Sequence, residues 1–300
     1  MASVRLTFLV SVAMLAFAGN SLLCRVALKH TAIDPATFTS IRLVSGACML
    51  WWVVQWQRRY AAAVIAEPVP APVLALPGSW LSASALFVYA AGFSFAYTSM
   101  PAATGALMLF GAVQVTMIGY GTYRGERMRA MQIIGFALAL VGLVVLMLPG
   151  LATPSLSASL CMLGAGVAWG VYSLRGKETH TVCAASPTSV TAGNFIRAVP
   201  MAMVLSLLMV SRLSLDVSGI LLAIASGALA SGIGYAVWYQ ALPALASTHA
   251  ATVQLSVPVI AAFGGVAFIG EAFTLPLVLA STAILGGMAL VILQKEVPPQ

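Results

Sequence analysis

Apolar runs of about 20 residues follow one another along nearly the whole chain, separated by charged, proline or glycine residues. An α-helix needs a run of about this length to cross the hydrocarbon core of a bilayer. Of the 300 residues, 61% are hydrophobic and only 7% are charged, which is too little polar surface to solvate a globule of this size. The sequence therefore predicts an all-α integral membrane protein in contact with the lipid bilayer.

We expect ten transmembrane helices with breaks at the polar points. Asp34-Pro35 and Ser186-Pro187 each place a capping side chain before a proline at the first helical position, which marks two of the helix starts. The expected spans cover residues 5–28, 35–56, 77–98, 102–122, 130–148, 156–175, 187–210, 217–240, 245–268 and 274–293.

The distribution of charge predicts how the chain is oriented. The net charge is +7, but the Lys and Arg residues fall in short loops between apolar runs, so we read them as a topology signal and expect no nucleic-acid partner. With a cytoplasmic N-terminus, nine Lys and Arg residues lie on the cytoplasmic side and only Arg25, Lys29 and Arg212 lie on the other. We expect a multi-pass protein of a bacterial inner (plasma) membrane with both termini in the cytoplasm.

The N-terminus allows a second interpretation. Arg5, the apolar run after it and Ala16-Phe17-Ala18 mimic a signal peptide with an A-x-A cleavage site. The stretch from Phe17 to Arg25, however, has a counterpart deep inside the chain, where no signal peptide can lie. A first membrane helix is therefore the favoured interpretation.

The chain contains an internal repeat. Gly92, Tyr97 and Pro101 recur 142 residues later, and Gly125-Glu126 recurs 145 residues later. Three further pairs lie 152 residues apart: Phe17 with Trp169, Arg25 with Lys177, and Pro35 with Pro187. We expect two five-helix units, residues 1–150 and 151–300. Because five is odd, the second unit enters the membrane from the opposite side, so the repeats are inverted, as in many secondary transporters.

These motifs resemble those of the drug/metabolite transporter superfamily, in its ten-helix EamA-type branch. The similarity lies in a first helix of the type Trp-Gly followed by a basic residue, here Trp169-Gly170 to Lys177, and in a fourth helix that ends in Gly-Glu. It covers nearly the whole chain. The first unit departs from the pattern, with Phe17-Ala18 in place of Trp-Gly. The resemblance implies export of small metabolites, and the aromatic residues are similar to those of aromatic amino acid exporters.

Polar and aromatic residues inside the spans are the candidates for a transport path, because polar groups that face lipid are costly. Aromatic faces with a few hydrogen-bonding tips suit a flat neutral or zwitterionic solute. His249 and Gln254 lie about 140° apart on a helix, so we expect only one of them to face a narrow cavity. The candidate substrate-binding residues are Asn20, Tyr89, Tyr97, Trp169, Tyr172, Trp238, Tyr239, His249 and Gln254.

The acidic, basic and metal-binding residues of the sequence restrict which substrates and cofactors are expected. We expect no Asp or Glu in the middle of a span, which disfavours a proton-coupled exporter of cationic drugs. Arg42 and Arg197 lie inside spans, where snorkelling or a helix contact is the expected role, although either could bind a carboxylate or phosphate if it faced the cavity. The three histidines share no ligand spacing and the four cysteines have no close pair, so we expect no metal site, cofactor or disulfide framework.

The sequence thus predicts a monomeric secondary transporter, not an enzyme, that exports small neutral or zwitterionic metabolites, including aromatic amino acids, by alternating access. Two alternatives remain in the same superfamily, an exporter of drugs and an exporter of phosphorylated metabolites. A membrane-embedded enzyme and a channel are the alternatives outside it.

Overall fold

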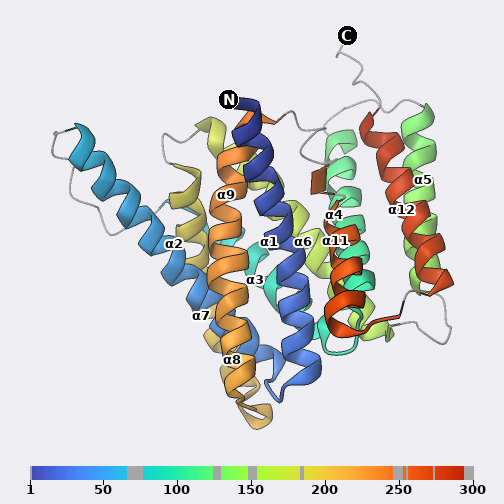
Figure 1. Cartoon of the computed structure of the whole chain (residues 1–300), viewed down its shortest axis with the longest axis horizontal. Coiled ribbons are helices and arrows are strands. Elements are labelled where there is room, and N and C mark those ends of the chain that lie inside the picture. The colour runs from blue at the N-terminus through green and yellow to red at the C-terminus, as the bar shows by residue number, and fades with distance from the viewer. Residues whose placement is uncertain are drawn as a thin grey trace.

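The helices run alongside one another through the molecule, and the start of α1 and the end of α12 lie at the same end of it (Figure 1). The computed structural model describes residues 2–65, 77–123, 130–147, 154–182, 186–245, 253–254, 256–272 and 274–293. Within these ranges the chain is helical and forms no β-strand. The predicted all-α class is confirmed for the part of the chain that the structure describes.

The helices occur where the apolar runs predict them. The first half contains α1 (Ala2–His30), α2 (Pro35–Ile65), α3 (Trp80–Tyr97), α4 (Ala102–Tyr123) and α5 (Ala130–Met147). The second half contains α6 (Leu156–Val182), α7 (Pro187–Leu208), η1 (Val210–Arg212), α8 (Val217–Ile224), η2 (Ala225–Ile233), α9 (Gly234–Ala241), η3 (Leu242–Ala244), α11 (Ser256–Gly264), η4 (Gly265–Ile269) and α12 (Leu275–Leu293).

Seven of the described helical segments are long and apolar enough to cross a membrane, and α8, η2 and α9 count together as one of them. Three shorter apolar segments, Ala130–Gly142, Ser256–Ile269 and Leu277–Gly287, fall within the remaining expected spans. The protein is therefore a multi-pass membrane protein by the length and composition of its helices.

Both predicted helix caps are confirmed. The Asp34 carboxylate accepts from the backbone N–H groups of Ala36 and Thr37 at 3.0 and 2.9 Å. The Ser186 hydroxyl accepts from the backbone N–H of Ser189 at 3.3 Å. Asp34 also accepts from the backbone N–H of Ser214 at 3.1 Å, so the same carboxylate ties the start of α2 to the segment before α8.

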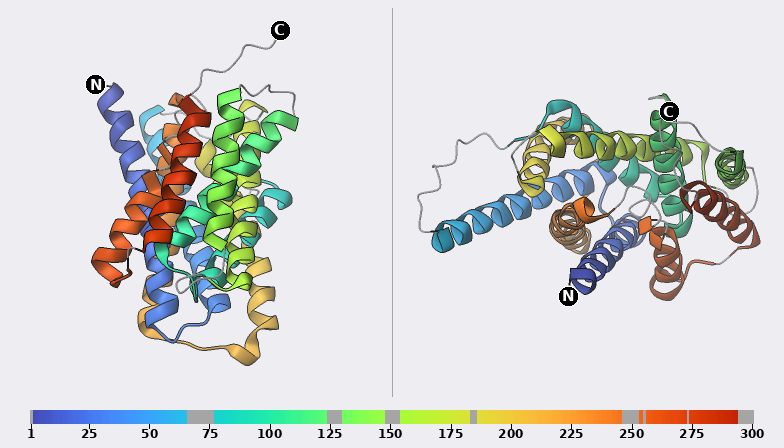
Figure 2. Two further views of the ribbon diagram at one scale, coloured as in Figure 1. Left: turned by 90° about the vertical axis from the view of Figure 1, so that its right-hand side faces the viewer. Right: turned by 90° about the horizontal axis from the view of Figure 1, so that it is seen from above.

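Helices from the two halves pack on one another in pairs. α2 packs on α7, α5 packs on α12, and α6 contacts both α3 and α4, while α1 contacts both α9 and α11. Figures 1 and 2 show the α5–α12 pair at one edge of the molecule and α2 leaning outward at the other. The interior between these edges is bounded mainly by α1, α3, α4, α6 and the α8–α9 segment.

Two glycines of the repeated motif let helices approach closely. A Cβ atom on Gly92 of α3 would lie 2.8 Å from the carbonyl oxygen of Cys161 in α6. A Cβ atom on Gly234 of α9 would lie 2.8 Å from the Cβ of Ala16 in α1. Both distances are too short for carbon, so the predicted role of Gly234 in close helix approach is confirmed and Gly92 plays the same role.

The helical segment from α8 to α9 contains nine residues of π-helix, η2, at its centre. Its large side chains, Leu229 and Ile233, are exposed, whereas its small residues Ser226, Gly227 and Ser231 are buried. These small residues face α2 and α1, the helices that η2 contacts. The widened turn therefore brings two serine hydroxyls into the interior, and π-helical turns often occur at functional sites.

A buried ion pair joins distant parts of the chain. Arg25 of α1 and Glu271, which follows η4, lie 3.1 Å apart from Nε to Oε1, and each side chain is only 8% exposed. Arg25 Nη1 also donates to the carbonyl oxygen of Tyr97 at 2.9 Å, and Glu271 Oε2 accepts from the backbone N–H of Ala102 at 2.8 Å. One pair of side chains thus connects α1, the end of α3, the start of α4 and the segment before α12.

This pair explains the second Gly-Glu motif. Gly270 has a positive φ of 69°, a conformation that glycine adopts without the steric cost of a Cβ, and it ends η4 so that Glu271 turns back into the molecule. The carboxylate then meets Arg25 and the backbone N–H at the start of α4, a helix far earlier in the chain. The first motif, Gly125-Glu126, lies outside the described residues.

Two arginines lie inside the bundle. Arg25 lies in α1, within the expected span 5–28, and is paired with Glu271. Of the two roles expected for Arg42, snorkelling or a helix contact, the structure shows the second, because Arg42 is 1% exposed and contacts residues of α3 and η2. Both side chains find polar partners inside the bundle, so neither needs to reach the membrane surface.

We predict that Glu271→Gln destabilises the protein by roughly 3–5 kcal/mol, because it leaves the Arg25 charge buried without its counterion. Thermal unfolding of the purified protein in detergent should show a midpoint several degrees lower. Asp216→Asn is the matched control: Asp216 caps α8 by accepting from the backbone N–H of Gly219, and asparagine caps equally well. Equal midpoints for Glu271→Gln and the wild type would show that the ion pair does not hold these elements together.

Candidate functional site

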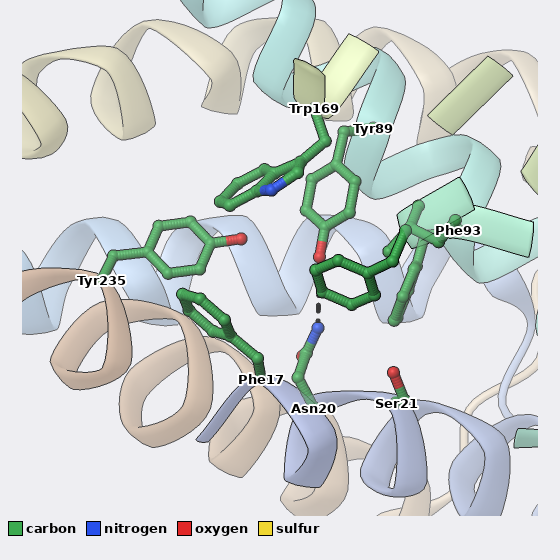
Figure 3. Close-up of a pocket in the computed structure, with 9 residues that line it drawn as sticks. Phe17, Asn20, Ser21, Tyr89, Phe93, Trp169 and Tyr235 are labelled. Carbon is green, nitrogen blue, oxygen red and sulfur yellow. Dashed lines mark hydrogen bonds between the residues drawn. The ribbon is translucent and has the colours of Figure 1, made fainter. Parts of the chain in front are cut away.

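A small enclosed cavity lies where helices from both halves of the chain meet (Figure 3). The space open to the centre of a water molecule is about 10 Å³, which is room for about one water. Helices α1, α3, α4, α6 and α9 provide its walls, with the lining residues Phe17, Asn20, Ser21, Tyr89, Phe93, Leu109, Phe110, Trp169 and Tyr235. A solute the size of an amino acid cannot enter until these helices separate.

Aromatic rings make up one wall of the cavity. Trp169 is central, with its ring centroid 4.9 Å from that of Tyr89 and 5.0 Å from that of Tyr235. Phe17 meets Tyr235 edge to face at 5.7 Å and Trp169 at 6.2 Å. Such ring pairs hold one another in a defined geometry, so the wall presents flat apolar faces in a fixed arrangement.

A polar network forms the other wall. The Tyr89 hydroxyl accepts from Asn20 Nδ2 at 3.4 Å, drawn as a dashed line in Figure 3, and from Arg42 Nη2 at 3.1 Å. The side-chain oxygen of Asn20, Oδ1, accepts from the Ser226 hydroxyl at 2.7 Å. The network therefore connects α1, α2, α3 and the π-helical segment η2 through one tyrosine hydroxyl and one amide.

Arg42 is the cation of this network. Its guanidinium lies 5.2 Å from the ring centroid of Tyr89 and 5.0 Å from that of Phe93, and its Nε donates to the Ser231 hydroxyl at 3.3 Å. Its Nη1 is buried and has no hydrogen-bond partner among the described residues. The hydroxyl of Tyr235 is likewise buried without a partner there, and it points toward the middle of the cavity (Figure 3).

Three of the predicted site residues line the cavity: Asn20, Tyr89 and Trp169. Tyr172 and Trp238 lie one ring away, since Tyr172 packs on Trp169 at 5.6 Å and Trp238 meets Phe17 at 5.9 Å between centroids. Both are buried, so they support the aromatic wall from behind.

The other predicted site residues do not line the cavity. Tyr97 is fully buried and donates to the carbonyl oxygen of Ala102 at 3.3 Å, which ties the end of α3 to the start of α4. Tyr239 is buried against Gly176 of α6, and Gln254 is buried as well. His249 lies outside the described residues. Both Tyr97 and Tyr239 lie near the ends of their expected spans, yet both are enclosed by protein.

Ser21 and Tyr235, which are polar residues inside expected spans, also line the cavity, and the prediction of site residues omitted Phe17, Phe93, Leu109 and Phe110. The repeat could have found some of them. Phe17 and Trp169 are partners at the offset of 152, and Phe93 and Tyr235 are partners at the offset of 142, and all four line the cavity. Leu109 and Phe110 carry no polar group or repeat signal, so nothing in the sequence distinguishes them from packing residues.

Membrane-length helices around a buried, aromatic-lined cavity define a multi-pass membrane protein with a polar and aromatic interior. Residues 156–293 match the model of the EamA-like transporter family. An uncharacterized protein of Pseudomonas aeruginosa, PA1977, is 50% identical over 289 residues, which are 96% of this chain and 95% of that protein. The chain belongs to the EamA-like transporter family, within the drug/metabolite transporter superfamily.

A solved structure shares the fold. A crystal structure described as "Crystal structure of protein" superposes with a TM-score of 0.63 over 96% of this chain and 97% of its own, at 20% sequence identity. At that identity the likeness concerns the fold alone, and it extends over nearly the whole length of both chains.

We predict that Tyr89→Phe and Tyr235→Phe have different effects on stability. Tyr89→Phe removes the acceptor for Asn20 and Arg42 and leaves two buried donors unpaired, which costs about 1–3 kcal/mol. Tyr235→Phe removes a buried hydroxyl that has no partner, so stability should be unchanged or higher. Thermal unfolding midpoints of the two variants test this, and an equal loss in both would contradict the network described above.

Proposed function

We propose that the protein exports small neutral or zwitterionic metabolites, including aromatic amino acids, across the bacterial inner membrane. The observation that carries the proposal is the cavity itself: tilted and edge-to-face aromatic rings on one wall, and an amide and hydroxyls on the other. An aromatic ring fits between flat apolar faces, and a polar head group can exchange hydrogen bonds with Asn20, Ser21 and Tyr89. Membership of a transporter family makes a small-molecule substrate the starting point.

The same proposal includes ten transmembrane helices in two inverted repeats, residues 1–150 and 151–300. Helix packing supports it, because α2 packs on α7 and α5 on α12, while the contacts of α6 with α3 and α4 parallel those of α1 with α9 and α11. The match of the family model to residues 156–293, about one proposed unit, also fits. The Phe17–Trp169 contact lies between equivalent positions, as expected at an axis that relates the halves.

Alternating access follows from the closed cavity. Since the space holds about one water, substrate must enter when helices separate at one end and leave when they separate at the other. Because the ends of α1 and α3 and the start of α4 are joined by the buried Arg25–Glu271 pair, this pair closes one of the two ends. We propose that both termini lie in the cytoplasm and that the transporter acts as a monomer.

Among the predicted site residues, we propose that Asn20, Tyr89 and Trp169 contact the substrate. Tyr172 and Trp238 hold the aromatic wall, and Tyr97, Tyr239 and Gln254 act in helix packing. None of the described residues that line the cavity is acidic. That favours a neutral or zwitterionic solute over an organic cation, which needs a carboxylate to offset its charge.

Reconstitution tests the function. We predict saturable uptake and counterflow of labelled phenylalanine in liposomes that contain the purified protein. Failure of phenylalanine, threonine and methionine to show either would overturn the proposal, and fluxes that do not saturate would indicate a channel.

We predict that Trp169→Ala changes the preference between phenylalanine and threonine in the same assay, because it removes the central ring of the aromatic wall. Trp80→Ala is the matched control, since Trp80 is 60% exposed on α3. An unchanged preference in Trp169→Ala protein of normal yield would show that the ring packs but does not contact substrate.

A further inference from the structure

We propose that Arg42 and Tyr235 form an anion subsite that binds the carboxylate of the substrate. This inference rests on the proposed function and narrows it: the solute must carry a free carboxylate, and its apolar part lies against the aromatic wall.

The first reason is an unused donor. Arg42 is 1% exposed, its Nε and Nη2 donate to Ser231 and Tyr89, and its Nη1 has no partner among the described residues. Leaving a charged donor unpaired in the interior costs free energy unless another group binds it. The Tyr235 hydroxyl is a second buried group with no hydrogen-bond partner among the described residues. Tyr235 lines the cavity, and so does Tyr89, to which Arg42 donates. A carboxylate can accept from both an arginine and a hydroxyl.

The second reason is that no acidic side chain described by the structure serves as a counterion to Arg42. The acidic residues whose side chains are described are Asp34, Asp216 and Glu271, and each binds other groups: the starts of α2 and α8, and Arg25. The aromatic faces of Tyr89 and Phe93 offset part of the Arg42 charge, but cation–π contacts leave the guanidinium edge able to donate. The net positive charge is therefore retained next to the cavity.

The third reason is that the fold does not need a cation at this place. The residue 152 positions after Arg42 is Asn194 on α7, at the same offset that relates Pro35 to Pro187. Asn194 donates from Nδ2 to the Tyr172 hydroxyl at 3.5 Å and accepts from the backbone N–H of Ser79 at 3.0 Å. A neutral amide occupies the equivalent position and still joins the helices there, so this helix contact does not by itself require an arginine.

The position of Arg42 connects it to the cavity. It contacts Tyr89 and Phe93, which both line the cavity, from the side of α2 and η2. A carboxylate that reaches Nη1 and the Tyr235 hydroxyl leaves its apolar portion beside Trp169. An arginine can bind a carboxylate through two parallel hydrogen bonds, which fixes orientation as well as charge.

The test compares acids with their amides on the wild-type protein. In detergent, 3-phenylpropionate and phenylalanine should raise the thermal unfolding midpoint, whereas 3-phenylpropanamide and phenylalanine amide should raise it far less. From the strength of hydrogen bonds to charged groups, we expect the acids to bind at least about tenfold more tightly. Phenyl phosphate and inorganic phosphate are included in the same series.

Variants test which residues cause the difference in binding between acids and amides. Arg42→Gln should abolish the difference between acid and amide, Arg42→Lys should keep part of it, and Tyr235→Phe should reduce it without lowering the midpoint of the unliganded protein. Arg197→Gln is the control, because Arg197 of α7 donates to the carbonyl oxygen of Gly193 on its own helix and should leave the difference unchanged.

The outcomes separate this inference from the proposed function. No difference between acids and amides in the wild type, or an unchanged difference in folded Arg42→Gln protein, overturns the anion subsite even if amino acids are transported. The protein could instead fail to transport amino acids but still bind acids more tightly than amides, with the difference depending on Arg42. That result would overturn the proposal of amino acid export and would support the anion subsite. Stronger binding of phenyl phosphate than of 3-phenylpropionate overturns the assignment of a carboxylate in favour of a phosphate ester. If Arg42→Gln does not fold, the comparison of acids with amides on the wild type and on Arg42→Lys tests the subsite. The subsite requires tighter binding of acids to the wild type and a smaller difference in Arg42→Lys.

Discussion

The structure depends on one constraint: a polar group inside an apolar membrane must find its partner within the protein. The chain offers few such groups, and the helices place them together. Asn20, Arg42, Tyr89 and the serines of η2 come from four elements and meet in one network. The exposed faces of the same helices carry large apolar side chains such as Val88 and Leu229. The polar residues thus fix how each helix is rotated, and the rotation in turn creates the cavity.

Close helix packing and the Arg25–Glu271 ion pair lie at different places. Small residues, Gly92, Gly234 and the π-helical segment, bring helices of the two halves into contact near the cavity. The ion pair lies where α3 and α4 meet and the segment before α12 begins. Separating its two side chains would leave uncompensated charges in the interior, so this contact is costly to break.

Much of the fold could be predicted because the signals are local. Asp34 and Ser186 cap helices where their position before a proline predicts it, and the apolar runs mark the helices. The site was predicted less well. Asn20, Tyr89 and Trp169 line the cavity as predicted, but Tyr97 bonds to the α3–α4 turn and Tyr239 packs on α6. An aromatic residue in a span has the same sequence signature whether it faces substrate, a neighbouring helix or lipid.

The sequence by itself determined the membrane class, the placement of the helices, their caps and the resemblance to a transporter superfamily, because hydropathy and capping depend on neighbours along the chain. The tertiary structure decided which residues meet. Arg42 and Ser231 are 189 residues apart and Arg25 and Glu271 are 246 apart, and no local pattern encodes such pairs. They form because packing sets the rotation and depth of each helix, and those are properties of the whole bundle. For that reason the sequence left open whether Arg42 snorkels or contacts another helix, and the structure places it in the interior, with Nη1 unpaired among the described residues.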